Sequence, residues 1–73
     1  NNFVIHPNPT NSTFYITSGM QIENLCIYNQ IGQKVYFEKQ VQNPVDVSKL
    51  ESGIYILEFQ VDKKKVREKL VLE

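Results

Sequence analysis

The sequence is poor in the residues from which most catalytic and metal sites are built. Its 73 residues include one cysteine, one histidine and no tryptophan. A single cysteine excludes an internal disulfide and a thiolate zinc cluster. One histidine with scattered acids gives no cluster of metal ligands. The chain also lacks a glycine-rich phosphate loop and a nucleophile elbow. We therefore expect no catalytic residue, no metal site and no cofactor.

The two reactive side chains that are present do not form an obvious pair. Cys26 lies between Leu25 and Ile27, which is typical of a small buried hydrophobic residue. A reactive thiol needs an activating base nearby, and the only histidine, His6, belongs to a distant segment. The sequence argues against an enzyme.

Length and hydropathy indicate one domain. No apolar run approaches the roughly 20 residues of a membrane-spanning helix. Hydrophobic residues make up 41% of the chain and charged residues 22%, which is typical of a globular domain. We expect a single domain over residues 1–73, with residues 1–2 as a linker remnant. Because no initiator methionine or signal peptide is present, we expect the chain to be a piece of a longer protein.

Charge is balanced overall but unevenly distributed. Residues 1–61 hold three basic and five acidic side chains, whereas residues 62–73 hold five basic and three acidic ones. Two interpretations stay open: a solvated turn and strand edge, or a docking surface for a partner. A nucleic-acid partner is not expected, because that would need a larger basic excess on one face.

Alternation of apolar and polar residues with a period of two recurs along the chain and predicts β-strands. The pattern puts Phe14 and Ile16 on one face of a strand, and Tyr55, Leu57, Phe59 and Val61 on one face of another. Residues 25–38 read as a hairpin, with Val35 and Phe37 on one face and Tyr36 on the other. Further inward positions are expected at Val45, Val47, Leu50, Val66, Leu70 and Leu72.

Turn residues separate these segments. Gly32 and Gly53 stand where a turn needs a positive φ, and Pro44 should begin a strand because it cannot donate to a ladder. Glu68 breaks the apolar phase of the last strand, so we expect a bulge or solvent exposure there. About seven short strands at regular spacing predict an antiparallel β-sandwich of two sheets.

Four motifs occur in order along this pattern. "HPNPTN" contains Pro7, Asn8 and Pro9, and reads as a rigid brace at the entry to the sandwich. "IYNQIGQKV" contains Gly32, "LESGIYILEF" contains Gly53 and Tyr55, and "KLVLE" ends the chain. Together they resemble the C-terminal sorting domain of cargo for the type IX (Por) secretion system of Bacteroidetes, although His6 replaces the tyrosine usual before the first proline.

This resemblance implies an Ig-like β-sandwich that acts as an address. It implies that an outer-membrane translocon and its shuttle components recognise the domain on an N-terminal cargo after passage through the periplasm. A sortase would then remove the domain at its N-terminal junction and attach the cargo at the cell surface, unless the cargo is released. Lys69, Leu70, Val71 and Leu72 are the predicted recognition residues, as a strand-addition or groove ligand. No small-molecule ligand is implied.

One alternative function stays open. The domain could be an accessory Ig-like module that binds carbohydrate or protein, with Tyr15, Tyr28 and Tyr36 as candidate stacking residues. Buried tyrosines whose hydroxyl groups reach the surface would give the same pattern.

Overall fold

The computed structural model describes residues 3–73, which form seven β-strands and no helix. The strands are β1 (Phe3–His6), β2 (Thr13–Ser18), β3 (Ile22–Tyr28), β4 (Lys34–Gln40), β5 (Val45–Asp46), β6 (Gly53–Val61) and β7 (Lys64–Leu72). Residues 1–2, expected to be a linker remnant, lie outside the described residues.

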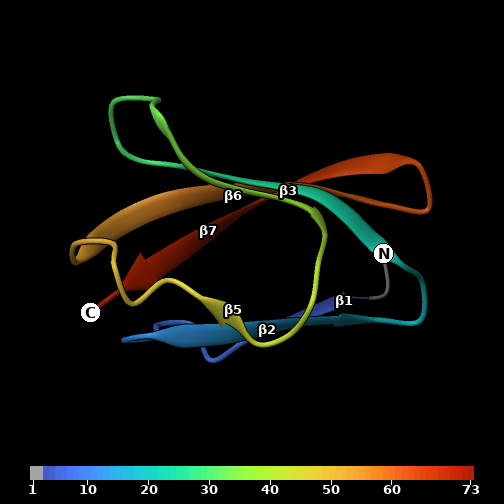
Figure 1. Cartoon of the computed structure of the whole chain (residues 1–73), viewed down its shortest axis with the longest axis horizontal. Helices are drawn as coiled ribbons and strands as arrows, with labels where there is room; N and C mark the ends of the chain where they lie inside the picture. The colour runs from blue at the N-terminus through green and yellow to red at the C-terminus, as the bar shows by residue number, and fades with distance from the viewer. Residues whose placement is uncertain (1–2) are drawn as a thin grey trace.

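The strands form two antiparallel sheets that face each other (Figure 1). The three-stranded sheet has the order β1-β2-β5, and the four-stranded sheet has the order β4-β3-β6-β7. Every strand pair is antiparallel. The predicted all-β sandwich of about seven strands in two sheets is confirmed.

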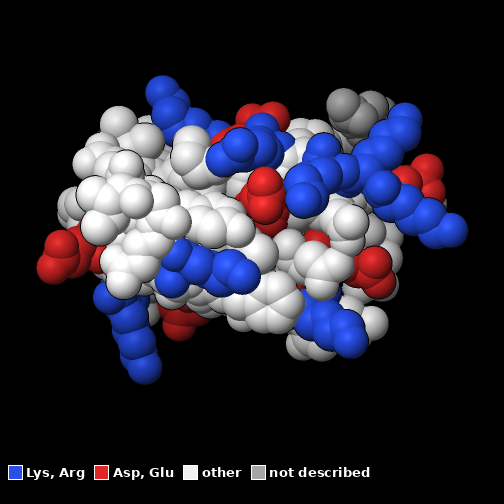
Figure 2. Space-filling view, turned by 90° about the horizontal axis from the view of Figure 1, so that it is seen from above, with Lys and Arg blue, Asp and Glu red and all other residues white. Residues whose placement is uncertain are grey.

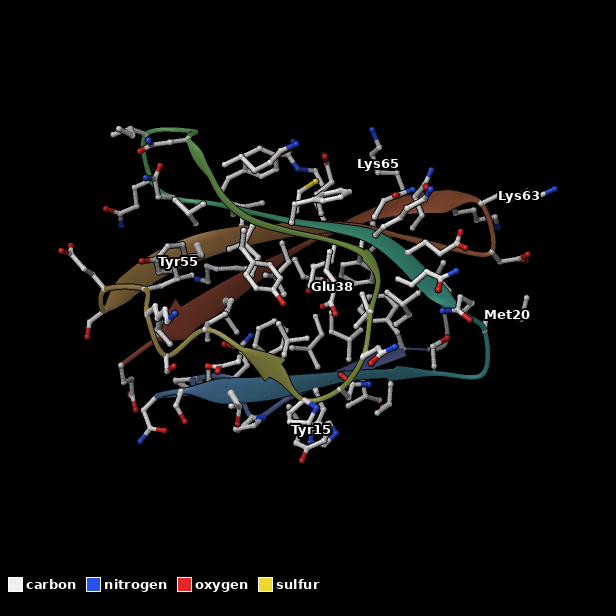
Figure 3. The ribbon with its side chains drawn as sticks, in the orientation of Figure 1. Tyr15, Met20, Glu38, Tyr55, Lys63 and Lys65 are labelled. Carbon is white, nitrogen blue, oxygen red and sulfur yellow. The ribbon has the colours of Figure 1, made fainter. Side chains whose placement is uncertain are left out.

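Inward side chains of both sheets form one core, which fills the space between the ribbons in Figure 3. Each strand alternates between this core and the outside, because successive side chains point to opposite faces. The predicted inward residues of β2, β5 and β6 are all buried, and Leu50 and Val66 pack against them while partly exposed. The buried hydrophobic cluster consists of Phe14, Ile16, Ile22, Leu25, Ile27, Val45, Val47, Tyr55, Leu57, Phe59, Val61, Leu70 and Leu72.

Strand β4 departs from the predicted alternation. Val35 and Tyr36 both pack against the core, whereas the Phe37 side chain is 54% exposed on the outside. The cause is a register shift between β3 and β4 at Ile27 and Tyr28, which gives β4 one extra residue and reverses its phase. The prediction that Val35 and Phe37 share a face is therefore wrong.

The β6–β7 hairpin is regular. Val61 pairs with Lys64, so the loop consists of Asp62 and Lys63 alone, with φ values of 52° and 65°. Positive φ at both positions is typical of the type I′ turn, whose twist matches that of paired strands. Glu68 causes no bulge and is exposed, so the second of the two expected outcomes is confirmed.

Pro44 directly precedes β5, as predicted. Because β5 has only two residues, it leaves part of the β2 backbone without a strand partner. The side chain of Asn43 supplies the missing bonds: its Oδ1 accepts from the Ile16 N–H at 2.9 Å, and its Nδ2 donates to the Ile16 carbonyl at 2.8 Å.

Candidate recognition site

The first motif of the chain lies against the last strand. The Asn8 side chain donates from Nδ2 to the Lys69 carbonyl at 2.8 Å, and its Oδ1 accepts from the Val71 N–H at 3.0 Å. These partners are 61 and 63 residues away along the chain. A carboxamide carries N–H donors and a carbonyl acceptor in one plane, so it can take the place of the peptide group of a neighbouring strand.

Thr10 continues the same contact with its backbone. Its N–H donates to the Val71 carbonyl at 2.9 Å, and its carbonyl accepts from the Glu73 N–H at 2.7 Å. Thr10 and Leu72 form a parallel bridge. The Thr10 hydroxyl donates to the Thr13 carbonyl, and the residue is only 3% exposed. Residues 8–10 therefore pair with residues 69–73, and we call this contact the N-terminal clamp.

The clamp covers one end of an edge strand. β7 is the last strand of its sheet, so the backbone groups on its outer side have no further strand to pair with. Lys69, Val71 and Glu73 direct such groups to the clamp. Along a strand, the backbone N–H and C=O groups of every second residue point to the same edge. The backbone groups of Lys65 and Arg67 therefore also point to the outer edge of β7, at positions that the clamp does not reach.

The predicted recognition residues divide into two pairs. Leu70 is 0% exposed and Leu72 is 3% exposed, and both belong to the core. Lys69 is exposed and lies opposite Ile56, whereas Val71 is half-buried and lies opposite Ile54. A partner of the folded domain can contact only Lys69 and Val71 directly, while the two leucines hold the strand in place.

The second motif forms a closed turn around Asn29. The Asn29 Oδ1 accepts from the N–H groups of Ile31 at 3.1 Å and Gln33 at 2.9 Å, as an Asx turn does. The Asn29 carbonyl accepts from the Gly32 N–H at 3.0 Å. Gly32 has a φ of 84°, which confirms the predicted positive value.

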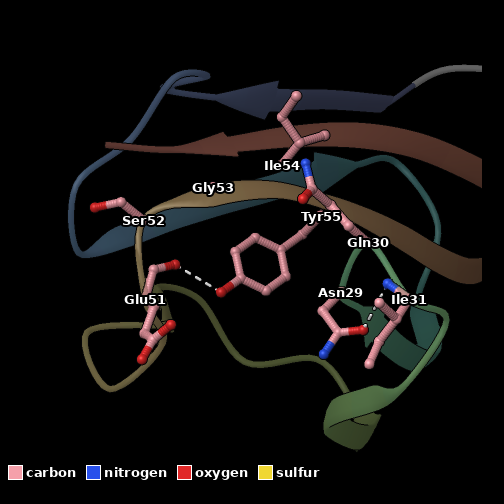
Figure 4. Close-up of a pocket in the computed structure, with 8 residues that line it drawn as sticks. All are labelled: Asn29, Gln30, Ile31, Glu51, Ser52, Gly53, Ile54 and Tyr55. Carbon is pink, nitrogen blue, oxygen red and sulfur yellow. Dashed lines mark hydrogen bonds between the residues drawn. The ribbon is translucent and has the colours of Figure 1, made fainter.

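The third motif closes a turn with a tyrosine. The Tyr55 hydroxyl donates to the Glu51 carbonyl at 2.6 Å, and the ring is 7% exposed (Figure 4). Gly53 has a φ of 152°, which favours glycine and confirms the predicted special conformation. The motif glycines and Tyr55 thus shape the loops.

These two turns meet at one end of the sandwich. A hollow of about 250 Å³ lies between them, lined by residues 29–31 and 51–55 (Figure 4). Its titratable residues are Glu51, which is exposed, and Tyr55, whose hydroxyl is used to close the turn, and its other polar groups largely serve the turns themselves.

The shifted pKa values of the domain have structural causes. Burial, with a smaller contribution from the bond of its hydroxyl to Glu38, raises the pKa of Tyr36 to about 12. Hydrogen bonds from Ser48 lower the pKa of the Asp46 carboxyl. These groups lie on separate strands and do not form a reaction centre. Within residues 3–73 there is no group of three or more His, Cys, Asp or Glu side chains that could hold a metal ion, and no helix there could span a membrane.

Two of the three candidate stacking tyrosines do not have a fully exposed ring on which a ligand could stack. The hydroxyl groups of Tyr28 and Tyr36 contact Glu58 at 3.5 Å and Glu38 at 3.1 Å, and both rings are half-buried. Tyr15 is 39% exposed and stacks on His6, with ring centroids 5.4 Å apart and planes at 8°. The three rings do not form one sugar-binding surface.

Comparison with known proteins points to one family. A model of the family described as "Secretion system C-terminal sorting domain" matches residues 4–73. A search of curated proteins found no match. The matched range includes the clamp, both turns and the last strand.

Proposed function

The chain belongs to the family of secretion system C-terminal sorting domains, the signals for type IX secretion, and from this premise we propose that the clamped C-terminal strand is what the secretion machinery reads. Membership itself implies interaction with the type IX machinery, an N-terminal cargo, and export to the cell surface or the extracellular space. We further propose that the domain is non-catalytic and that recognition takes place in the periplasm, by the outer-membrane translocon and its shuttle components.

The observation that supports this proposal is the N-terminal clamp. It joins the first and last motifs of the domain into one element, although they lie more than 60 residues apart in sequence. A partner that contacts Lys69 and Val71 therefore meets a strand whose position is fixed from both sides, by β6 and by residues 8–10. Pre-ordering of this kind lowers the entropy cost of binding.

Cleavage would take place away from the clamp. The four residues of β1, Phe3–His6, separate residues 7–10 from the N-terminal junction, so a sortase acting there works beyond β1. We propose that the sortase removes the domain there and that the cargo is then attached at the surface.

The test uses a reporter protein fused to residues 1–73 in a host with type IX secretion. Val71→Glu places a charge on the outward face of the recognition strand, and Val4→Glu does the same at an exposed position, 57% accessible, on the edge strand β1. Secretion should fall with Val71→Glu and persist with Val4→Glu, while circular dichroism shows both purified domains folded. Equal secretion of the two variants would contradict recognition at this strand.

A further inference from the structure

The outer face of the four-stranded sheet can be reconstructed from the strand register. Residues directly opposite each other in antiparallel strands point to the same side. Glu58 of β6 faces outward, because its neighbours Leu57 and Phe59 are fully buried. Glu58 lies opposite Arg67 on one side and Cys26 on the other.

The same reasoning extends the face to all four strands. Cys26 lies opposite Phe37, Ile56 lies opposite Tyr28 and Lys69, Ile54 opposite Val71, and Gln60 opposite Lys65 and Glu23. Lys34 lies opposite Tyr28, and its Nζ is 5.4 Å from the centre of the Phe37 ring. Lys39 follows Phe37 by two positions, which places it on the same side. We call this set of residues the basic face.

The basic face has an apolar interior. The side chains of Phe37 and Ile54 are 54% and 42% exposed, and Tyr28, Ile56 and Val71 are half-buried beside them. Large apolar side chains left open to water on one face are typical of an interaction surface.

Its charges are mostly positive. Figure 2 views this side of the molecule and shows Lys and Arg spread over it, with an acidic group near the centre and others toward the margins. The five cations of the face are Lys34, Lys39, Lys65, Arg67 and Lys69. It also holds two carboxylates: Glu58, which already has a partner in Arg67 at 3.6 Å, and Glu23, which lies exposed opposite Gln60. The strands of the other sheet carry no Lys or Arg at all.

Two hollows lie on the face, on either side of Glu58. One of about 180 Å³ is lined by Asn24, Cys26 and Lys65 among others, and one of about 430 Å³ by Tyr28, Ile56 and Arg67 among others. Such hollows can receive individual side chains of a partner.

We propose that the basic face docks an acidic protein surface of the secretion machinery, with carboxylates opposite the lysines and Arg67 and an apolar side chain against Phe37. The proposal rests on the function proposed above and adds a second contact to the clamped strand. A protein fits this face better than an anionic polysaccharide or a lipid headgroup. An acidic protein surface would pair the cations and also exclude water from Phe37 and Ile54, which matches a protein interface with an apolar centre and a polar rim.

The first test is a charge reversal with a matched control, in the reporter fusion. Lys34→Glu, Lys39→Glu and Lys65→Glu together alter the face, whereas Lys49→Glu, Lys63→Glu and Lys64→Glu together change the net charge equally outside it. Secretion by the first triple variant should fall about tenfold or more, because three exposed pairs would each become repulsive. The control variant should stay within about twofold of the unmodified fusion. Equal secretion by the two triple variants overturns the proposal.

The second test identifies the occupant. A photo-crosslinking phenylalanine analogue at position 37 should give an adduct with a protein of the secretion machinery whose crosslinked segment is rich in Asp and Glu. The same analogue at position 15, on the opposite sheet, should not. An adduct with polysaccharide or lipid, equal adducts from both positions, or no adduct from position 37 overturns the proposal. If the unmodified fusion itself is not secreted, the function proposed above is wrong. If the unmodified fusion and the first triple variant are secreted equally well, only the inference about the basic face is wrong.

Discussion

Replacing Asn8 by alanine should destabilise the domain out of proportion to the exposure of this side chain. The substitution removes both side-chain bonds of the clamp, to the Lys69 carbonyl and from the Val71 N–H. A hydrogen bond contributes a net 0.5–1.5 kcal/mol to folding, so two bonds at an exposed site should contribute about 1–2 kcal/mol. In a domain of this size, each kcal/mol moves the melting temperature by about 4–8 °C, so the expected drop is about 4–16 °C.

The assay is thermal and urea unfolding of the isolated domain, followed by circular dichroism. Asn11→Ala is the matched control, since Asn11 lies exposed in the same loop. Asn8→Asp should lie between the two, because a carboxylate still accepts from the Val71 N–H but cannot donate to the Lys69 carbonyl.

Amide hydrogen exchange can locate the effect. In Asn8→Ala, the Val71 amide should lose protection, because its acceptor is gone. The Glu73 amide should be less affected, because its acceptor is the Thr10 backbone. If Asn8→Ala melts at the same temperature as Asn11→Ala and Val71 keeps its protection, the clamp does not hold the last strand.

Three further outcomes are expected for the purified domain in equilibrium unfolding. Tyr55→Phe removes the hydrogen bond of the hydroxyl group and should lower the free energy of unfolding by about 1 kcal/mol, whereas Tyr15→Phe should leave it almost unchanged. A Tyr55→Phe variant as stable as the unmodified domain would rule out the turn-closing role. Gly32→Ala should cost about 1–2 kcal/mol at a φ of 84°, and Gly19→Ala, in open space at an ordinary φ, should be tolerated; equal costs would contradict the strained turn. Because the folded pKa of Tyr36 is raised to about 12 from 10.0, its stabilising contribution should be complete below pH 10 and lost between pH 10 and 12. Tyr36→Phe should therefore lose less stability between pH 10 and 12 than the unmodified domain. The same loss of stability in both proteins would refute the contribution of Tyr36.

Much of the sandwich follows from local patterns in the sequence. Period-two alternation predicts the buried face of β6, from Tyr55 to Val61, because one side of a strand in a two-layer fold must be apolar. Gly32 and Gly53 mark turns because few other residues adopt their φ values.

The phase of β4 could not be predicted in the same way. One extra residue at Val35 moves Tyr36 inward and Phe37 outward, and this bulge depends on the pairing with β3. A short segment with apolar residues at three successive positions does not reveal which of them points to the core.

The clamp and the basic face depend on contacts between distant segments. The position of Asn8 between two prolines indicates that its side chain forms hydrogen bonds with backbone groups. The neighbouring sequence does not predict that these groups belong to Lys69 and Val71. Asn43, which also precedes a proline, bonds the β2 backbone in a similar manner, so both Asn-Pro pairs complete strand edges here. The basic face likewise needs the order β4-β3-β6-β7, which brings the lysines of residues 34–39 and 65–69 to one side.

The central claim is that this domain, folded with its clamped last strand, is sufficient as a type IX sorting signal. The most direct measurement is the fraction of a reporter found outside the cell when it carries residues 1–73 at its C-terminus, in a host with an intact type IX system and in one without it. We expect the reporter outside only in the intact host, and much less of it when Val71→Glu alters the folded strand. A reporter that stays inside the intact host would contradict the account.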